Sequence, residues 1–322
     1  MSILLYAESA QGKVKKVGLE LASYAKKISE STSQKVIAVL TDQDAVSDLS
    51  QYGVDQIVVL DNQNLDEFNA NLYAKAISQV AGKYQASTVL ISSTADSLYL
   101  GGILAVELGA GYASNVIALP VSFEPFKVKR NAFSNKAFQI TELTSEVKLL
   151  SLAKNSFGLV ENQSTPGIEH FTAEFSDNDQ AMEVENTEKL SGKIAIADAE
   201  IVVSGGRGLK GPENWALVEE LADVLGAATA CSKPVSDIGW RPHSEHVGQT
   251  GKPVAANLYI AIGISGAIQH IAGINASKVK VVINTDSEAP FFKVADYGIV
   301  GDAFEVVPEL IEKLKEFKAQ NA

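Results

Sequence analysis

Two glycine-rich stretches in the last third of the chain contain the residue types that hold a phosphate-bearing cofactor. The run Gly263-Ile-Ser-Gly-Ala-Ile-Gln-His270 overlaps the end of the apolar segment 258–264, and the two together read as a buried strand, a glycine turn and a helix beginning at Ala267. Glycine lets the backbone approach a ligand, and the unpaired N–H groups of a new helix favour a diphosphate. Such a turn by itself is also typical of plain α/β architecture.

The run Val247-Gly-Gln-Thr-Gly251 places Gln249 and Thr250 between two glycines. Both side chains and their amides could therefore face the edge of a ring. Polar residues also stand where the expected strands end, and they are Ser204, Ser232, Ser265, Asn284 and Asp302. Because an open parallel sheet binds its ligand outside the carboxyl ends of its strands, we expect a nucleotide at these positions.

Other kinds of site have less support. The histidines of His243-Ser-Glu-His246 have a spacing that suits metal ligands on a helix, but Pro242 indicates a loop and no third ligand is apparent, so we expect no metal. Cys231 reads as a small buried residue, and no G-x-S-x-G elbow is present. His270 could face the same ligand as the glycine turn or simply pack on the sheet.

The elements that must position these residues begin with an α/β series. Its expected strands lie at 3–6, 35–40, 56–60 and 88–92, and its expected helices at 14–28, 72–81 and 98–108. The period-two segments 138–141 and 147–153 are more typical of antiparallel or edge strands, and we expect a further edge strand within 168–175. The sheet should therefore end as a mixed one.

A polar stretch from 162 to 191 precedes a second series, which places the domain boundary within 193–199 and predicts domains of 1–195 and 196–322. The expected strands of the second series are 200–204, 227–231, 258–264, 278–284 and 297–300, and its helices are 215–225, one from 267, and 307–318. We predict an α/β protein with an N-terminal mixed, Rossmann-like domain and a C-terminal doubly wound parallel sheet. No glycine-rich phosphate loop follows the first strands, so we expect no nucleotide site in residues 1 to about 195.

Composition restricts the classes of partner. The 322 residues are 46% hydrophobic and 20% charged, and no apolar run reaches the length of a membrane span. A net charge of -12 and a pI near 4.9 argue against a nucleic-acid partner. One cysteine excludes an internal disulfide, and no basic leader precedes the first apolar residues, so we expect a cytoplasmic protein that is not membrane-inserted.

The order and spacing of these motifs, together with Ser204-Gly-Gly-Arg-Gly-Leu-Lys210 and Val294-Ala-Asp-Tyr-Gly-Ile-Val300, resemble the FAD-binding half of electron-transfer flavoprotein alpha subunits. The resemblance runs from about Ile201 to Leu314, and a looser likeness begins at Ile3-Leu-Leu-Tyr-Ala-Glu8. It implies that the second domain holds FAD and that the first helps to dock a beta subunit.

The resemblance also implies roles for single residues. Thr250 matches the residue that bonds the flavin N5, His270 the histidine at the pyrimidine edge of the ring, and Lys233 an arginine that lies over the ring. These three would tune the redox potential. The full set of implied FAD contacts is Arg207, Ser232, Lys233, Gln249, Thr250, Gly251, Ser265, Gly266, Ala267, Gln269, His270, Asn284 and Asp302. Lysine keeps the positive charge of the usual arginine but loses its planar fork, so the electrostatic contribution should persist while the geometry loosens.

By the same resemblance the protein is an electron carrier without substrate turnover of its own. It would take electrons from acyl-CoA and related dehydrogenases and pass them to an electron-transfer flavoprotein:quinone oxidoreductase, with AMP or a second nucleotide in the beta subunit. The alternatives are a stand-alone FAD- or NAD-dependent dehydrogenase, an electron-bifurcating flavoprotein subunit, and a nucleotide-binding module without redox function. Against the dehydrogenase, we find no acid–base pair beside the expected ring position.

Overall fold

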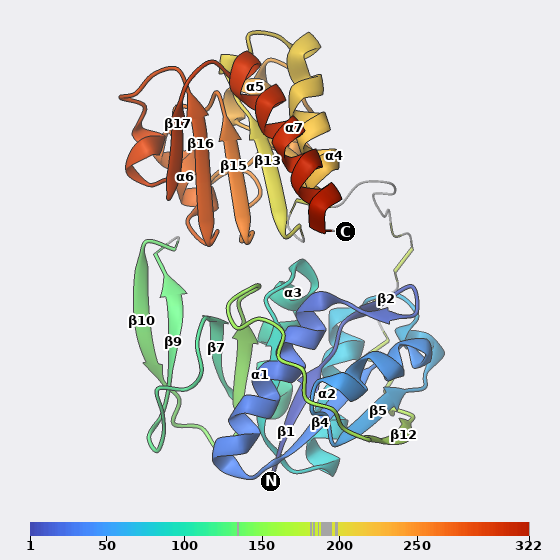
Figure 1. Cartoon of the computed structure of the whole chain (residues 1–322). Coiled ribbons are helices and arrows are strands. Elements are labelled where there is room, and N and C mark those ends of the chain that lie inside the picture. Colours follow the sequence, from blue (N-terminus) through green and yellow to red (C-terminus); the bar gives the residue numbers. More distant parts are fainter. Residues whose placement is uncertain are drawn as a thin grey trace. The chain divides into compact units, whose positions relative to one another are not determined.

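The computed structural model describes residues 1–133, 135–180, 182, 184–185, 187, 195–196 and 199–321. Its internal contacts divide the chain into two compact units, Met1–Ala132 with Phe138–Glu188, and Phe133–Ala137 with Lys189–Ala322. The boundary predicted between residues 195 and 196 falls in a stretch that lies mostly outside the described residues. It stays a prediction. The α/β class expected for both parts is confirmed (Figure 1).

The N-terminal unit is built on a large sheet with the strand order β12-β5-β4-β1-β6-β11-β7-β9-β10, and β8 pairs with β9. The strands are β1 (Ser2–Tyr6), β4 (Lys35–Leu40), β5 (Gln56–Leu60), β6 (Ala86–Ser92), β7 (Gly111–Val116), β8 (Ser122–Phe123), β9 (Phe126–Ala132), β10 (Ala137–Glu142), β11 (Lys148–Leu152) and β12 (Gly167–Phe171). A separate small ribbon pairs β2 (Ser9–Ala10) with β3 (Lys13–Val14). The sheet is parallel from β12 to β7 and antiparallel at β9, so the prediction of a mixed sheet is confirmed.

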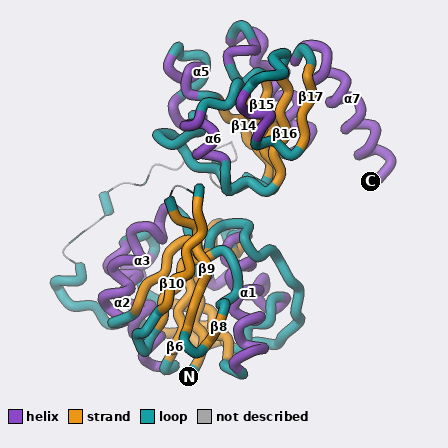
Figure 2. Tube along the Cα trace, turned by 90° about the vertical axis from the view of Figure 1, so that its left-hand side faces the viewer, coloured by secondary structure: helices purple, strands orange, loops and turns teal. Residues whose placement is uncertain are grey.

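Three α-helices cover the two faces of this sheet, α1 (Lys16–Thr32) on one and α2 (Ala70–Lys83) with α3 (Ala95–Leu108) on the other (Figure 2). The apolar side of α1, which includes Leu21 and Tyr24, packs on the first face. The helix α3 begins where the Thr94 hydroxyl accepts the Ser97 amide, and it ends at the left-handed Gly109. Short 3-10 turns, η1 (Gln43–Gln51) and η2 (Gln63–Leu65), complete the connections.

The prediction of an antiparallel or edge strand for 147–153 is wrong. β11 is parallel to both of its neighbours, β6 and β7, and it lies inside the sheet. Its residues from Leu149 to Leu152 are all buried, because a strand inside a parallel sheet is covered on both faces. The alternation in the sequence came from Lys148 at the start of the strand and from Ser151, which is itself buried, and not from a solvent-facing side. The edge strand expected within 168–175 is present as β12.

The C-terminal unit has a fully parallel five-stranded sheet among its described residues, in the order β14-β13-β15-β16-β17. The strands are β13 (Ile201–Gly205), β14 (Ala228–Cys231), β15 (Leu258–Ile262), β16 (Val279–Asn284) and β17 (Tyr297–Val300). The helices are α4 (Ala216–Leu225), α5 (Lys233–Asp237), α6 (Ile268–Ile274) and α7 (Ala303–Asn321), with 3-10 turns η3 (Arg207–Leu209), η4 (Pro212–Trp215), η5 (His243–Glu245) and η6 (Pro290–Lys293).

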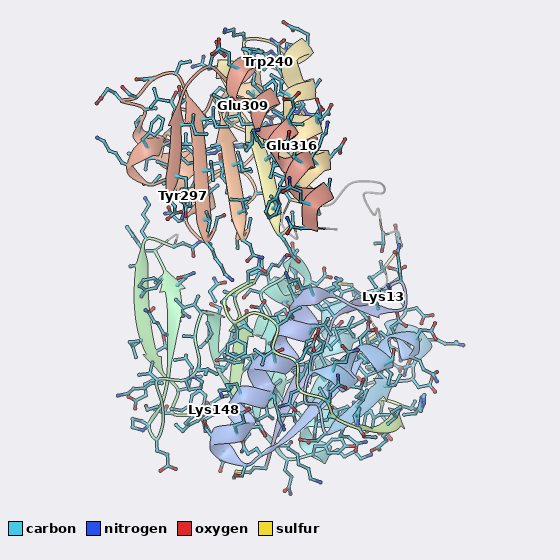
Figure 3. The ribbon with its side chains drawn as sticks, in the orientation of Figure 1. Lys13, Lys148, Trp240, Tyr297, Glu309 and Glu316 are labelled. Carbon is cyan, nitrogen blue, oxygen red and sulfur yellow. The ribbon has the colours of Figure 1, made fainter. Side chains whose placement is uncertain are left out.

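Both faces of this second sheet are covered, as the prediction of a doubly wound fold requires. The helices α4 and α7 bury Val218, Leu221, Val307 and Ile311 against one face, while α6 and the loop around Val254 pack on the other. β17 forms one edge and leaves Tyr297 67% exposed (Figure 3). No described helix combines the length and the apolar composition needed to cross a membrane.

Candidate functional site

The strand order of the C-terminal sheet creates one place where successive connections leave in opposite directions. From β13 the chain moves to β14 on one side, and it then returns to β15 on the other side of β13. The connections that follow β13 and β15 therefore lead towards opposite edges of the sheet, and they part at the carboxyl ends of these two strands. In open α/β sheets this topological switch point is where a ligand binds.

The two loops at the switch point are joined by backbone hydrogen bonds. The amide of Gly206 donates to the Ile262 carbonyl over 2.8 Å, and the amide of Gly208 donates to the Gly263 carbonyl over 3.1 Å. A Cβ at Gly208 would lie 2.7 Å from the Gly263 Cα, and Gly263 has a φ of +63°. Only glycine fits such a contact, so this edge exposes backbone that a larger residue would cover.

The turn after β15 packs against Phe291 and is hydrogen-bonded to its backbone. The Phe291 amide donates to the Ser265 carbonyl over 3.0 Å, and a Cβ at Gly266, whose φ is +88°, would lie 2.6 Å from the Phe291 nitrogen. The helix α6 begins at Ile268, one residue later than predicted, and its seven residues form about two turns. The side chains of Ser265, Ala267 and Gln269 are exposed.

The Val247–Gly251 loop is held between β14 and α6. The Val247 amide donates to the Cys231 carbonyl over 3.0 Å, and the Gln249 amide donates to the Gln269 carbonyl over 2.8 Å. A Cβ at Gly273 would lie 2.6 Å from the Gly248 Cα, so the loop lies directly on the helix. The loop is thus fixed through its backbone, which leaves the Gln249 and Thr250 side chains exposed.

His270 is buried beneath this loop and is only 6% exposed. Its Nε2 lies 2.9 Å from the Tyr259 hydroxyl, whereas its buried Nδ1 has no hydrogen-bond partner among the described residues. Burial and, to a smaller extent, nearby His246 lower the pKa of His270 to about 4, although the Val247 backbone acts in the opposite direction. The imidazole is therefore neutral near pH 7.

Two cationic side chains lie just after the carboxyl ends of β13 and β14. Lys233 is the first residue of α5 and Arg207 the first of η3, and both are exposed. Ser232 is buried, its amide donates to the Gly205 carbonyl over 3.1 Å, and its side chain does not cap α5. These two cations would partly balance the charge of a diphosphate.

The remaining two candidates already have partners. The Asn284 amide nitrogen donates to the Ile264 carbonyl over 3.1 Å, which braces the turn after β15. The Asp302 carboxylate accepts the Phe304 amide at the start of α7 and lies 3.6 Å from the Lys210 ammonium. Asn284 therefore has a structural task beside any contact with a ligand, and so does Asp302.

All thirteen predicted contact residues belong to the strand ends, loops and first helical turns at the carboxyl edge of one parallel sheet. Ser204, which we also expected at the ligand, is fully buried inside β13 and does not reach the surface. Sequence reasoning missed Tyr259 and Phe291. A hydroxyl within the aliphatic strand Leu258–Ile262 was the available signal for Tyr259, because a buried phenol needs a polar partner.

Neither a metal site nor a cysteine nucleophile is supported by the described residues. His243 Nδ1 lies 2.8 Å from the Ser236 hydroxyl, and among the described residues no group of three or more His, Cys, Asp or Glu side chains could hold a metal ion. Burial raises the pKa of Cys231 to about 12, so its thiol is not an activated nucleophile.

FAD suits the features present at this edge. The glycine contacts leave backbone accessible to a diphosphate, the exposed cations match its charge, and the orphaned His270 Nδ1 offers a buried polar atom that needs a partner. Exposed Gln249 and Thr250 belong to the loop that is hydrogen-bonded to α6 at the same edge.

The N-terminal unit has a comparable switch point, between β1 and β6. Here the buried Glu8 carboxylate occupies the ends of the strands. It accepts from the Thr94 hydroxyl over 2.5 Å and lies 3.1 Å from the Lys15 ammonium. An internal anion thus takes the hydroxyl groups at the start of α3 that an outside anion would need.

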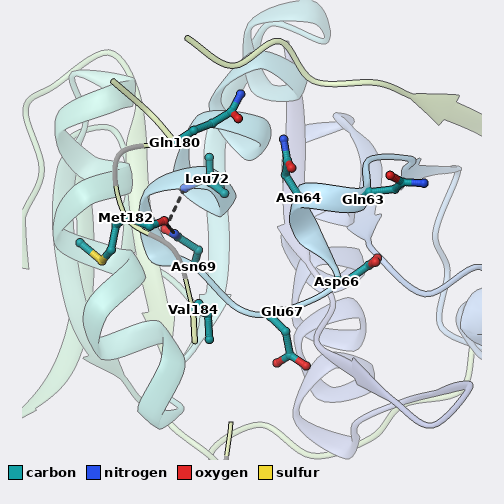
Figure 4. A pocket seen from close by; sticks show the side chains of 9 residues that line it. All are labelled: Gln63, Asn64, Asp66, Glu67, Asn69, Leu72, Gln180, Met182 and Val184. Atoms are coloured by element: carbon teal, nitrogen blue, oxygen red, sulfur yellow. Dashed lines mark hydrogen bonds between the residues drawn. The ribbon is translucent and has the colours of Figure 1, made fainter. Parts of the chain in front are cut away.

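A separate cavity of about 450 Å³ lies beside α2 in the N-terminal unit. Figure 4 shows its lining, which is largely polar and includes the carboxylates of Asp66 and Glu67. The Asn69 side chain is already used, because it accepts amides at the start of α2 and donates to the Met182 carbonyl over 2.9 Å. Two carboxylates have the wrong sign for a phosphate group.

Comparison with known proteins agrees with this geometry. Residues 3–176 match the family model described as electron transfer flavoprotein domain, and residues 195–275 match that of the electron transfer flavoprotein FAD-binding domain. A protein named electron transfer flavoprotein subunit alpha from Thermoanaerobacterium thermosaccharolyticum is 34% identical over 324 residues, which cover 98% of each chain.

Further relatives of that name come from Syntrophomonas wolfei, 35% identical over 97% of this chain and 98% of the relative, and from Bacillus subtilis, 34% identical over 98% and 97%. Among solved structures, the MurG protein of Acinetobacter baumannii is 13% identical over 99% of this chain and 90% of its own, with a TM-score of 0.30, which is too low to support an argument. The family matches and the full-length identities are decisive: this chain belongs to the electron transfer flavoprotein alpha-subunit family and includes that family's FAD-binding domain.

Proposed function

We propose that the chain carries electrons as the FAD-holding alpha subunit of a heterodimeric electron-transfer flavoprotein. The observation that supports this most directly is the convergence of the glycine loops, Arg207, Lys233 and the orphaned His270 Nδ1 at one sheet edge. FAD, when bound there, supplies the one-electron chemistry. Everything else at the site is binding, orientation and electrostatics.

Each residue then has a task set by its position. Arg207 and the amides after Gly266 hold the diphosphate, because guanidinium and free N–H groups both suit phosphate oxygens. Ser265, Ala267 and Gln269, all exposed on the same turn, contact the diphosphate and the ribityl chain.

At the ring, Thr250 would donate to N5, with Gln249 and Gly251 beside it in the loop. His270 would face the pyrimidine edge, and Lys233, next to Ser232, would place a positive charge above the ring. These donors favour the negative charge that reduction adds to the ring. Asn284 and Asp302 lie at the adenosine end.

We further propose that the electrons come from acyl-CoA and related dehydrogenases and leave to an electron-transfer flavoprotein:quinone oxidoreductase. A beta subunit completes the carrier and holds AMP or a second nucleotide, because the N-terminal unit of this chain already fills its own switch point with Glu8. The single buried cysteine suits a reducing compartment, which supports a cytoplasmic location.

The test is to co-express the chain with its beta subunit and to count flavin and AMP in the purified complex. We expect one FAD per heterodimer, reduction by an acyl-CoA dehydrogenase with its substrate, and reoxidation by the quinone oxidoreductase. Isolated alpha chain should lose flavin. A colourless complex would refute FAD binding, whereas a flavin complex that oxidises a small substrate by itself would favour a stand-alone dehydrogenase.

A further inference from the structure

A buried phenol lies within hydrogen-bond distance of the histidine of the proposed ring site. Tyr259 lies in β15 and is fully buried, and its hydroxyl lies 2.9 Å from the His270 Nε2. Either atom could be the donor in such a pair, so the position of the imidazole proton has to be derived from the surroundings.

The surroundings favour donation by the phenol. Burial raises the pKa of Tyr259, so the phenol keeps its proton at neutral pH, and the fully buried Ser204 hydroxyl is a second polar group near it. The two hydroxyls do not reach hydrogen-bond geometry. A buried phenol that donates to no acceptor costs the folded state about 1 to 3 kcal/mol of stability. The His270 Nε2 is the acceptor within hydrogen-bond distance.

If Nε2 accepts, the single proton of a neutral imidazole must be on Nδ1. The Val247 backbone raises the pKa of His270, as an acceptor near the remaining ring nitrogen does, although Nδ1 makes no hydrogen bond. Nδ1 is thus a buried donor that makes no hydrogen bond of acceptable geometry with any described residue. It lies under the Val247–Gly251 loop, at the proposed position of the ring.

Packing holds the pair rigidly. The Phe291 ring is parallel to that of Tyr259 at 6.4 Å and lies 6.1 Å from that of His270. Phe291 also supports the Ser265–Gly266 turn. Tyr259, His270 and the Ser265–Gly266 turn therefore all pack against the same phenylalanine, Phe291. This packing limits rotation of the imidazole.

We propose that Tyr259 is a positioning residue that donates to the His270 Nε2 and so makes the neutral imidazole present an Nδ1–H donor to the flavin ring. This rests on the proposed function for the place of the ring. The position of the proton itself depends only on Tyr259 and His270, and it can be tested separately.

The experiment uses the FAD-loaded heterodimer with ¹⁵N-labelled histidine. The chain has 4 histidines, and a His270→Gln variant identifies the signals of His270. We expect the protonated nitrogen of His270 to be Nδ1 in the wild type, and Tyr259→Phe to yield a mixture of both tautomers. The matched control is Tyr24→Phe, which removes another buried phenol, bonded to the Ala118 carbonyl in the N-terminal unit, and should leave His270 unchanged.

The second readout is the midpoint potential for the first electron. We expect Tyr259→Phe to lower the one-electron equilibrium constant about threefold to tenfold, which is about 30 to 60 mV, and Tyr24→Phe to leave it unchanged. A proton on Nε2 in the wild type overturns the proposal, and that measurement stands even if Tyr259→Phe does not fold. A tautomer change without any change in potential supports the role of Tyr259 and instead refutes the placement of the ring beside His270.

Discussion

Gly208 and Gly263 meet backbone to backbone at the carboxyl edge of the C-terminal sheet, where the Gly208 amide donates to the Gly263 carbonyl over 3.1 Å. This contact joins the loops after β13 and β15, the two strands that flank the switch point. The pair therefore sets how closely the two loops approach each other at the place where we put the diphosphate. Any side chain at Gly208 must push the loops apart.

Gly208→Ala should weaken FAD binding by roughly tenfold or more, because overpacking of this kind costs about 1 to 3 kcal/mol. Titration of the apo complex with FAD, followed by flavin fluorescence, measures the change. Gly226→Ala is the matched control. Gly226 has a φ of +66° but open space around it at the end of α4, so alanine there should reduce stability without changing FAD affinity. Equal losses of affinity in both variants would contradict the role of the contact.

Gly266→Val should yield protein without FAD. Valine at this position meets both a φ of +88° and the Phe291 backbone at 2.6 Å, so the Ser265–Gly266 turn cannot keep its shape. The flavin absorbance of the purified complex reports occupancy, and circular dichroism shows whether the fold persists. A folded variant that retains full FAD would mean that the diphosphate does not bind at this turn.

The sequence predicted the strand ends well because glycine and small polar residues occur where parallel strands meet a ligand. It predicted β11 poorly, since period-two alternation cannot distinguish an edge strand from a short buried strand that contains a buried serine. It also could not show that Ser204 points into the core or that Tyr259 reaches His270. Those are contacts between β13, β15 and α6, and they depend on how the elements pack.

Removing His270 should lower the midpoint potential for the first electron, but by less than the removal of a charged hydrogen-bond donor would. A charge-assisted bond would be worth roughly 65 to 130 mV, but burial keeps this imidazole neutral at pH 7 by lowering its pKa to about 4. For His270→Ala we therefore expect a drop on the order of 20 to 65 mV. A reductive titration with a dye of known potential measures it.

Lys233→Gln should lower the same potential by a smaller, salt-dependent amount, because an exposed ammonium is hydrated and screened. Lys233→Arg keeps the charge and is the control, with a potential close to that of the wild type. Unchanged potentials in both His270→Ala and Lys233→Gln would show that neither residue faces the flavin.

The neutral state of His270 also makes the C-terminal unit sensitive to acid. In the unfolded chain its pKa is near the ordinary 6.5, while in the folded chain it is about 4. Between these values the unfolded state binds the additional proton, so stability is complete above pH 6.5 and falls as the pH is lowered towards 4. The loss attributable to His270 approaches about 3 kcal/mol at pH 4. His246, whose pKa is also lowered chiefly by burial, adds to it in the same direction.

Urea denaturation at pH 7.5, 6 and 5 can follow this unit through tryptophan fluorescence, because both tryptophans, Trp215 and Trp240, belong to it. In constant excess FAD, His270→Gln should lose less stability between pH 7.5 and 5 than the wild type does, even if it is less stable at pH 7.5. His170→Gln, which replaces an exposed histidine of the N-terminal unit, should keep the slope of the wild type. Equal slopes in the wild type and His270→Gln would mean that His270 titrates normally, and the neutral donor inferred for the ring site would then be untenable.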